Sequence, residues 1–272
     1  MLQRIKLNIY LFYLVILIFN VESNKCYTIN NNDLVLPRYE LIKKYSRSNK
    51  SVILEKKLSL IECQKLAITR KALAFNYYKN KNNNNNNNNK LNCQLLECPE
   101  INSFSSLIRD NKFNYYSLYP RYLYPVNTTV KCLPRVGVFI ISEESKNYTE
   151  AKRICEEING KLAHVISEER TEGLAKFISH STPVFVGLSN CRSSRDRFWK
   201  NEFDEPLDCF DYRAWNKGEP SASRGCVGLI VTKSLISNIT PAWRVLPCSK
   251  SLPFICEILP RVKINKKDLS FL

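Results

Sequence analysis

The first apolar segment of the chain differs in kind from all later ones. Residues 7–19 are apolar apart from Asn8 and follow the basic residues Arg4 and Lys6. A membrane-spanning helix needs about 18 or more apolar residues, so this shorter run predicts a signal peptide, residues 1–23, cleaved near Ser23. The mature chain is therefore expected to be secreted and extracellular, without a transmembrane anchor.

The second half of the chain shows a helical period twice. Asn147 can cap a helix and Gly160 can end it. Between them, apolar side chains recur at helical spacing at Ala151, Ile154, Cys155 and Ile158. A second helix is expected to start at Ser167 and to carry an apolar face made of Thr171, Leu174, Ala175 and Ile178.

Short apolar runs predict strands in the rest of this half, at 136–141, 184–188, 226–231, 242–246 and 253–257. Three prolines precede the first run, which places a linker at 120–135. A run of eight Asn at 82–89, within an expected loop 80–90, is a solvated insertion in the first half. With 272 residues, the chain is predicted to hold two α+β domains.

Eleven cysteines all lie beyond the predicted cleavage site. In an oxidising compartment they indicate a disulfide framework rather than metal ligation or thiol catalysis, and the odd count leaves at least one outside the intrachain pairs. Asn-x-Ser/Thr motifs predict a glycoprotein with acceptor sites at Asn49, Asn127, Asn147 and Asn238.

The formal net charge of +16 allows an anionic partner such as a sulfated glycan or an acidic membrane surface. Nucleic acid is not expected, because a secreted chain rarely meets it. The abundance of Lys and Asn throughout favours a general compositional bias over a dedicated patch. The densest basic clusters are 43–47, 192–197 and 261–267, the last within a basic tail at 259–272.

Residues 136–258 resemble a C-type lectin-like domain. The motifs follow the family's order: Tyr148–Cys155 for the first helix, Gly160–Val165 with Ser167–Glu169, Phe185–Leu188, Trp199, Trp215–Pro220, Cys226–Val227, Trp243, Pro247–Ser249 and Pro253–Glu257. The resemblance implies two helices, short antiparallel strands and a long loop region. It also implies the disulfides Cys155–Cys256 and Cys226–Cys248, and we expect Cys191 to pair with Cys209 in the same domain.

Sugar-binding members of that family hold a calcium ion with Glu-Pro-Asn, an acidic residue before the next cysteine, and Trp-Asn-Asp. Here these motifs read Glu219-Pro220-Ser221, Arg224-Gly225 and Trp243-Arg244-Val245. Calcium needs six to eight oxygen ligands, several of them anionic, and Glu219 alone supplies a carboxylate. We therefore predict no metal and no cofactor, with Pro220 kept for loop shape, where a cis peptide bond would fit.

The expected function is recognition of an extracellular protein or a carbohydrate without calcium. An anionic group on that ligand would suit the two arginines, Arg224 and Arg244. The surface expected to carry it consists of Trp215, Glu219, Pro220, Ser221, Arg224, Trp243 and Arg244. Two alternatives stay open: a calcium-dependent sugar-binding lectin with another metal site, and a structural component of the extracellular matrix.

Residues 24–119 resemble a PAN/apple domain, in which a cysteine-bearing helix precedes two strands. The segments concerned are Ser59–Leu66, Ala74–Tyr77 and Cys93–Leu96. A MANSC-type domain is the alternative, on the motif Cys93–Cys98. The resemblance implies Cys63–Cys93 and an outer bridge from Cys26 to Cys98 or Cys132. The fifth cysteine would either cross-link two chains into a homodimer or stay buried.

Catalytic residues are not predicted. His164 and His180 are the two histidines, and neither lies in a nucleophile or metal motif. The acidic pairs Glu168-Glu169 and Asp204-Glu205 fall at a helix start and in a loop, where solvation and the helix dipole account for them. The chain is expected not to be an enzyme.

Overall fold

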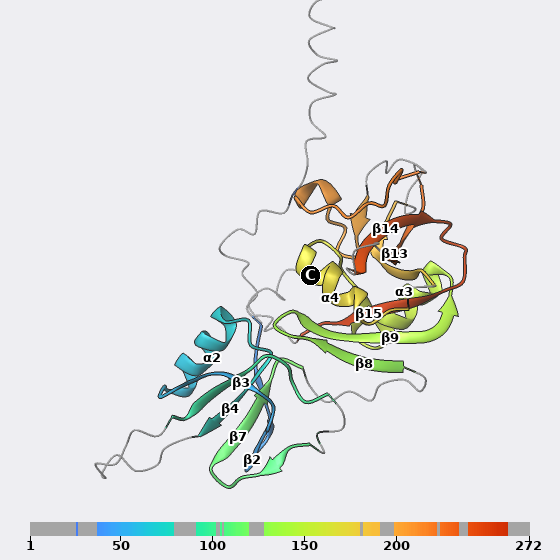
Figure 1. The fold of residues 1–272 in the computed structure, drawn as a ribbon. Coiled ribbons are helices and arrows are strands. Elements are labelled where there is room, and N and C mark those ends of the chain that lie inside the picture. The colour runs from blue at the N-terminus through green and yellow to red at the C-terminus, as the bar shows by residue number, and fades with distance from the viewer. Residues whose placement is uncertain are drawn as a thin grey trace, which may run out of the picture.

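The computed structural model describes residues 26, 37–78, 91–101, 104, 106–119, 128–179, 182–190, 199–221, 224–233 and 239–260. The predicted signal peptide, the Asn run, Asn127, Asn238, Cys191 and residues 261–272 of the tail lie outside these ranges. Figure 1 shows two bodies, one with helix α2 and one with helices α3 and α4. In the described ranges, no helix is long and apolar enough to span a membrane.

The N-terminal body is an antiparallel sheet of five strands with one helix. Its strand order is β1-β7-β4-β5-β3. The bounds are β1 Glu40–Lys43, β3 Val52–Lys56, β4 Ala74–Tyr78, β5 Cys93–Leu96 and β7 Phe113–Ser117. A separate ribbon pairs β2 (Ser46–Arg47) with β6 (Ile108–Arg109). Stacked rings of Phe75 and Tyr116, with centroids 4.8 Å apart, pack across neighbouring strands of the sheet.

Helix α2 (Leu60–Thr69) begins with a capping box. The backbone N–H of Ser59 donates to Oε2 of Glu62 at 2.8 Å, and the N–H of Glu62 donates to Oγ of Ser59 at 3.3 Å. Cys63 and Ala67 lie four residues apart on the buried face, and Cys63 is bonded to Cys93 of β5. The disulfide therefore fixes the helix on the sheet.

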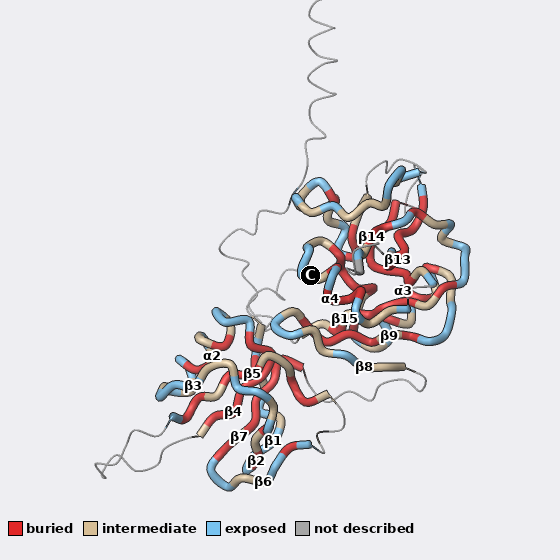
Figure 2. Tube along the Cα trace, viewed as in Figure 1, coloured by how far each residue is buried: buried red, intermediate tan, exposed pale blue. Residues whose placement is uncertain are grey.

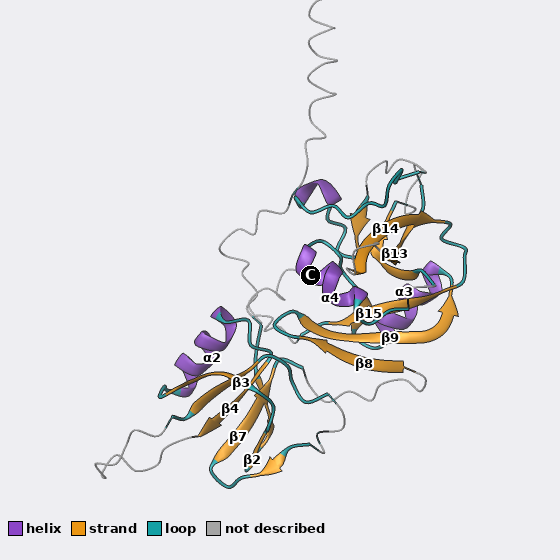
Figure 3. Ribbon diagram, in the orientation of Figure 1, coloured by secondary structure: helices purple, strands orange, loops and turns teal. Residues whose placement is uncertain are grey.

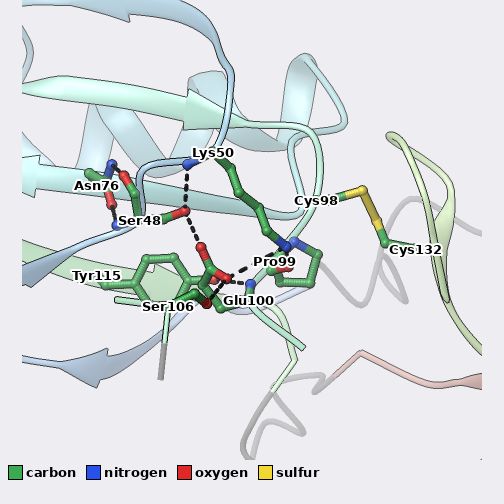
Figure 4. A network of polar contacts seen from close by, with 9 residues as sticks. All are labelled: Ser48, Lys50, Asn76, Cys98, Pro99, Glu100, Ser106, Tyr115 and Cys132. Atoms are coloured by element: carbon green, nitrogen blue, oxygen red, sulfur yellow. Dashed lines mark hydrogen bonds and ion pairs between the residues drawn. A yellow bond between two sulfur atoms is a disulfide. The ribbon is translucent and has the colours of Figure 1, made fainter. Parts of the chain in front are cut away.

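A buried carboxylate organises the polar interior of this body (Figure 4). The side chain of Glu100 accepts hydrogen bonds from the hydroxyls of Ser48 and Ser106, and Nζ of Lys50 lies 3.6 Å from Oε2. The backbone N–H of Glu100 donates to Oη of Tyr115 at 2.8 Å. Since Glu100 is only 5% exposed, these contacts replace the water that the carboxylate gives up on folding.

The C-terminal body is built on a larger sheet of strand order β14-β13-β11-β15-β9-β8, with β10 beside β15 and β12 beside β11. Its elements are β8 Thr128–Leu133, β9 Gly137–Lys146, α3 Tyr148–Glu157, β10 Gly160–Leu162, α4 Glu168–Ala175, β11 Val184–Ser189, β12 Lys200–Asn201, the 3-10 helix η1 Leu207–Cys209, β13 Cys226–Lys233, β14 Ile239–Leu246 and β15 Leu252–Ile258. Figure 3 shows the mixture of helices and strands that the sequence predicted.

Both helices of this body start where the sequence places them. Oδ1 of Asn147 accepts a hydrogen bond from the N–H of Glu150 at 2.9 Å, and Ser167 caps α4 in the same way. Ala151 and Cys155 face the core from α3. Gly160 is needed after α3, because a Cβ there would lie 2.5 Å from the carbonyl oxygen of Glu257.

The expected linker at 120–135 is in part a strand. Residues 128–133 form β8, which pairs along its whole length with β9. The three prolines that suggested a linker flank this strand, and Pro134 lies in the turn between β8 and β9. The alternation from Thr128 to Leu133 was obscured because the strand is only half-buried at the sheet edge.

Two disulfides differ from the expected pairing, and the first of them joins the two bodies. Cys98 bonds to Cys132 of β8, and Cys26 bonds to Cys209 in η1. The expected pair Cys191–Cys209 and the expected bridges of Cys26 to Cys98 or Cys132 are therefore not formed. The physical reason is that η1 and the N-terminal segment lie together despite a sequence separation of 183 residues.

The remaining described bridges are Cys63–Cys93, Cys155–Cys256 and Cys226–Cys248, each as expected from the resemblances. An ion pair adds to the junction between the bodies. Nε of Arg135 donates to Oε1 of Glu97 at 2.9 Å, and the backbone N–H of Arg135 donates to the carbonyl oxygen of Glu97 at 3.3 Å. One continuous apolar core runs through both bodies, and Figure 2 shows buried segments on each side of the junction.

Candidate ligand-binding site

The loop that carries Glu219 is anchored to the hairpin of β13 and β14 at the edge of the C-terminal sheet. The N–H of Asn216 donates to the carbonyl oxygen of Trp243 at 2.9 Å, and the N–H of Glu219 donates to that of Asn216 at 2.9 Å. Gly218 lies in the left-handed region, with φ of 81°, which glycine adopts without steric cost. The loop thus reverses direction directly beside β14.

Glu219 and Ser221 lie on the outer side of this loop. The peptide bond between Glu219 and Pro220 is cis, as the sequence suggested. Oε2 of Glu219 accepts two hydrogen bonds from Ser221, one from its backbone N–H at 2.7 Å and one from its hydroxyl at 2.8 Å. The carboxylate that the calcium motif would have used is therefore engaged within its own motif.

Strand β14 presents the other two motif positions. Trp243 and Val245 are buried on one face of the strand, whereas Arg244 between them is exposed. Cγ1 of Val245 lies only 2.5 Å from where a Cβ of Gly225 would stand. Val245 therefore packs against the backbone and supplies no oxygen to the loop.

These residues do not fit a calcium ion. The donor set consists of one carboxylate that already accepts two hydrogen bonds and one hydroxyl, while Arg224 and Arg244 add positive charge. A hard divalent cation needs several free anionic oxygens. Throughout the described ranges, no group of three or more His, Cys, Asp or Glu side chains could hold a metal ion.

The two tryptophans expected at the ligand surface belong to an aromatic cluster. Trp243 is fully buried, and Trp215 is half-buried with its ring centroid 5.3 Å from that of Trp243 and 5.2 Å from that of Trp199. Tyr212, three residues before Trp215, packs edge-on against Trp243. The expectation that Trp243 touches a ligand is therefore not met, because its ring is the core beneath the site.

A hollow of about 230 Å³ opens beside Arg244. Gly228 is the residue opposite Arg244 in β13, and its missing side chain lets Pro183 approach the hairpin. The lining residues come from four segments of the chain: Thr182, Pro183, Asn216, Ile230, Val231, Thr232 and Arg244. Arg224 is exposed but does not line it.

Sequence motifs missed Thr182, Asn216 and Thr232, because none belongs to the calcium pattern. The hollow combines one exposed guanidinium with amide and hydroxyl groups, and no carboxylate lines it. Such a set suits an anionic or polar group of a few atoms.

His164 is the one histidine that the described ranges include. It is 8% exposed, and its ring packs edge-on against Phe203 with centroids 4.5 Å apart. Its Nε2 has no hydrogen-bond partner among the described residues. Burial holds the pKa of His164 below its usual value, although Glu257, Glu205 and Glu202 oppose this and Arg170 adds to it. The ring's contact with Phe203 is a packing contact.

We expect acid to destabilise the fold partly through His164. An unfolded histidine takes up a proton near its ordinary pKa of about 6.5, whereas the folded one does so at lower pH. Stability is therefore complete above about pH 6.5 and is lost as pH falls toward the folded pKa. Urea unfolding at neutral and acidic pH should show a smaller acid loss for His164→Phe than for the wild type. An equal loss in both proteins would contradict this assignment.

Comparison with known proteins identifies the C-terminal body. Residues 144–258 match the family model described as "Lectin C-type domain". Collectin-10 of Gallus gallus is 30% identical over 152 residues, which are 51% of this chain and 50% of that protein. The chain therefore spans about half the length of this relative. The "C-type lectin mannose-binding isoform" of Notechis scutatus scutatus is 27% identical over 135 residues, 46% of this chain and 79% of that protein.

Solved structures each align with about half of the chain. Human lithostathine is 22% identical and covers 50% of this chain and 98% of its own, with a TM-score of 0.38. A crystal structure titled as a calcium-independent type II antifreeze protein is 21% identical and covers 51% of this chain and 96% of its own, with a TM-score of 0.37. The family match thus identifies a lectin C-type domain in residues 144–258.

Proposed function

Since residues 144–258 form a C-type lectin domain, we propose that the protein is a secreted recognition protein that binds its ligand without calcium. The ligand is an extracellular protein or a glycan. One observation carries the proposal. Glu219, the only carboxylate of the motif, accepts both of its hydrogen bonds from Ser221 of the same loop. The metal-dependent contact with sugar hydroxyls then has no residues to make it.

Calcium is expected to leave the melting temperature unchanged. A ligand present at 100 times its Kd stabilises a protein by about 2.7 kcal/mol, which raises the melting temperature of a protein of this size by about 5 °C or more. Thermal melts in millimolar calcium and in chelator should therefore coincide. A rise of several degrees with calcium would refute metal independence. A Ser221→Asn, Arg244→Asn, Val245→Asp variant, which restores motif oxygens, is the informative comparison.

The hollow beside Arg244 is proposed to take an anionic group of the ligand. Its exposed guanidinium lies among the amide of Asn216 and the hydroxyls of Thr182 and Thr232, and charge-assisted hydrogen bonds to such a group contribute about 1.5–3 kcal/mol. A glycan array run with and without chelator should find ligands that bind in both conditions. Binding of these ligands should fall about tenfold or more in Arg244→Ala.

Comparing Arg224→Ala with the double variant Arg224→Ala, Arg244→Ala separates the contributions of the two arginines to binding. Arg224 does not line the hollow, so Arg224→Ala alone should bind nearly as the wild type does. Unchanged binding by the double variant would exclude an anion at this face, while metal independence would remain open to the melting experiment.

We further propose that the N-terminal domain is PAN/apple-like and acts as a second interaction module. The features in its favour are the cysteine-bearing helix α2, the strands β4 and β5 that follow it, and the disulfide Cys63–Cys93 between helix and strand. Glycosylation is proposed at Asn49, which is exposed, and at the half-buried Asn147. A disulfide-linked homodimer would have to use Cys191, because the five described bridges occupy the other ten cysteines.

A further inference from the structure

Two turns meet at the end of the N-terminal body that lies away from the C-type lectin domain. Ser46 of β2 pairs with Arg109 of β6, and the N–H of Asp110 donates to the carbonyl oxygen of Tyr45 at 2.9 Å. Figure 2 shows β1, β2 and β6 together at this end, with exposed segments around them. The turn after β1 and the turn before β7 therefore share one surface.

This surface, which we call the basic tip, consists of Lys43, Lys44, Tyr45, Arg109 and Lys112, all exposed. Within the described ranges, none of its four cations forms an ion pair. The two segments that build it, 41–47 and 108–114, contain a single carboxylate, Asp110. The tip thus carries charge that the described residues do not neutralise.

Asp110 is not available to balance these cations. Its Oδ2 lies 3.2 Å from Nε of Arg47, and its Oδ1 accepts a hydrogen bond from the backbone N–H of Lys112 at 3.0 Å. The carboxylate is therefore used to hold the two turns together. The consequence is a fixed array of four cations rather than a set of charges on separate loops.

Tyr45 adds a flat apolar face in the middle of this array. It is 61% exposed, and its backbone has φ of 53°, a conformation that few residues other than glycine adopt. The N–H of Tyr45 donates to Oδ1 of Asn114 at 3.2 Å, which ties the turn to β7. The ring is thus held outward by its backbone.

We propose that the basic tip binds a sulfated polysaccharide chain. Sulfate groups repeated along a polymer match several unpaired cations at once, and the face of a sugar ring can stack on an exposed aromatic ring. A protein partner would need an apolar centre within about 800 Å² per side, which this charged surface lacks. A bilayer would need a continuous apolar face to insert, whereas Leu41, Tyr45 and Ile108 are the only exposed large apolar side chains at this end among the described residues.

The test compares two charge-matched variants of the full chain on heparin, a sulfated polysaccharide. The tip variant carries Lys43→Gln, Lys44→Gln, Arg109→Gln and Lys112→Gln. The control carries Lys56→Gln, Lys65→Gln, Arg70→Gln and Lys71→Gln, four exposed cations of the same body. The tip variant should bind heparin about tenfold or more weakly at physiological salt, because each exposed contact contributes little alone but four act together. The control should bind within about twofold of the wild type.

Tyr45→Ser, which removes the ring and no charge, should weaken heparin binding by about threefold to tenfold. Circular dichroism and thermal melts of each variant check that folding is retained. Equal weakening in the tip and control variants would overturn the proposal, because net charge alone would then explain binding. Wild-type binding by the tip variant would overturn it too. So would binding to vesicles with 30% phosphatidylserine but not to heparin, which would assign the tip to membranes.

Discussion

Removing the disulfide Cys155–Cys256 with paired alanine substitutions is expected to lower the free energy of unfolding by about 4–5 kcal/mol. The bridge joins α3 to β15 and spans 101 residues, the longest loop closed within the C-type lectin domain. Both cysteines are buried in the core. The unfolded chain without it gains much more conformational freedom than the folded chain does. The measurement is urea unfolding followed by tryptophan fluorescence.

The matched control is removal of Cys226–Cys248, which closes a loop of 22 residues. In the chain-entropy account this bridge contributes about 1 kcal/mol less. Greater loss of stability on removing Cys226–Cys248 would show that local packing of the loop region, rather than loop closure, dominates. The Cys155→Ala, Cys256→Ala protein is also expected to lose ligand binding at physiological temperature, because helix α3 would no longer be fixed on the sheet.

Glu100→Ala is expected to lower the free energy of unfolding by about 3 kcal/mol. Its carboxylate accepts hydrogen bonds from the hydroxyls of Ser48 and Ser106 and forms an ion pair with Lys50 (Figure 4). Alanine would leave the buried hydroxyl of Ser48 without its acceptor, whereas the exposed Ser106 can turn to water. Lys50 would lose a partner too, but its side chain is 36% exposed and can turn to water. The same unfolding measurement gives the value.

Two further variants test whether the loss of stability is specific to the buried network. Glu100→Gln keeps the shape and one acceptor oxygen, so it should cost about half as much as the alanine substitution. Glu55→Ala removes an exposed carboxylate of the same sheet, which accepts a hydrogen bond from Gln94 at 2.8 Å, and should change stability by about 0.5 kcal/mol or less. If Glu100→Ala and Glu55→Ala had similar effects, the buried network would not be a source of stability.

The helices of the C-terminal body could be predicted, because their caps and apolar faces depend on residues that are close in the sequence. The caps Asn147 and Ser167 and the apolar spacing after them locate α3 and α4. The partner of Cys209 could not be predicted, because it is Cys26, 183 residues away in the sequence. Spacing along the chain contains no information on such a contact. Strand β8 was missed for a related reason, since the prolines that flank it in the sequence resemble a linker and only its pairing with β9 makes it a strand.

The candidate site divides in the same way. The loss of calcium ligands could be predicted, because it depends on residue types at Glu219, Ser221, Arg244 and Val245. The hydrogen bonds from Ser221 to Glu219 needed the loop geometry. The hollow beside Arg244 could not be foreseen, because its walls come from β13, β14 and two separate loops. Trp243 was misassigned because the sequence of a binding motif does not show whether its aromatic side chain faces the ligand or the core.

Two of the disulfides have a consequence for proteolytic processing of the chain. Cys98–Cys132 and Cys26–Cys209 both connect a residue before position 120 with a residue after position 127. A protease that cut the chain in that interval would produce two polypeptides that stay covalently attached. Release of the C-type lectin domain as a free fragment would then require a reductant or a disulfide isomerase as well as the cut. Shedding of this domain is in that sense a two-step event, controlled by the thiol chemistry of the surroundings.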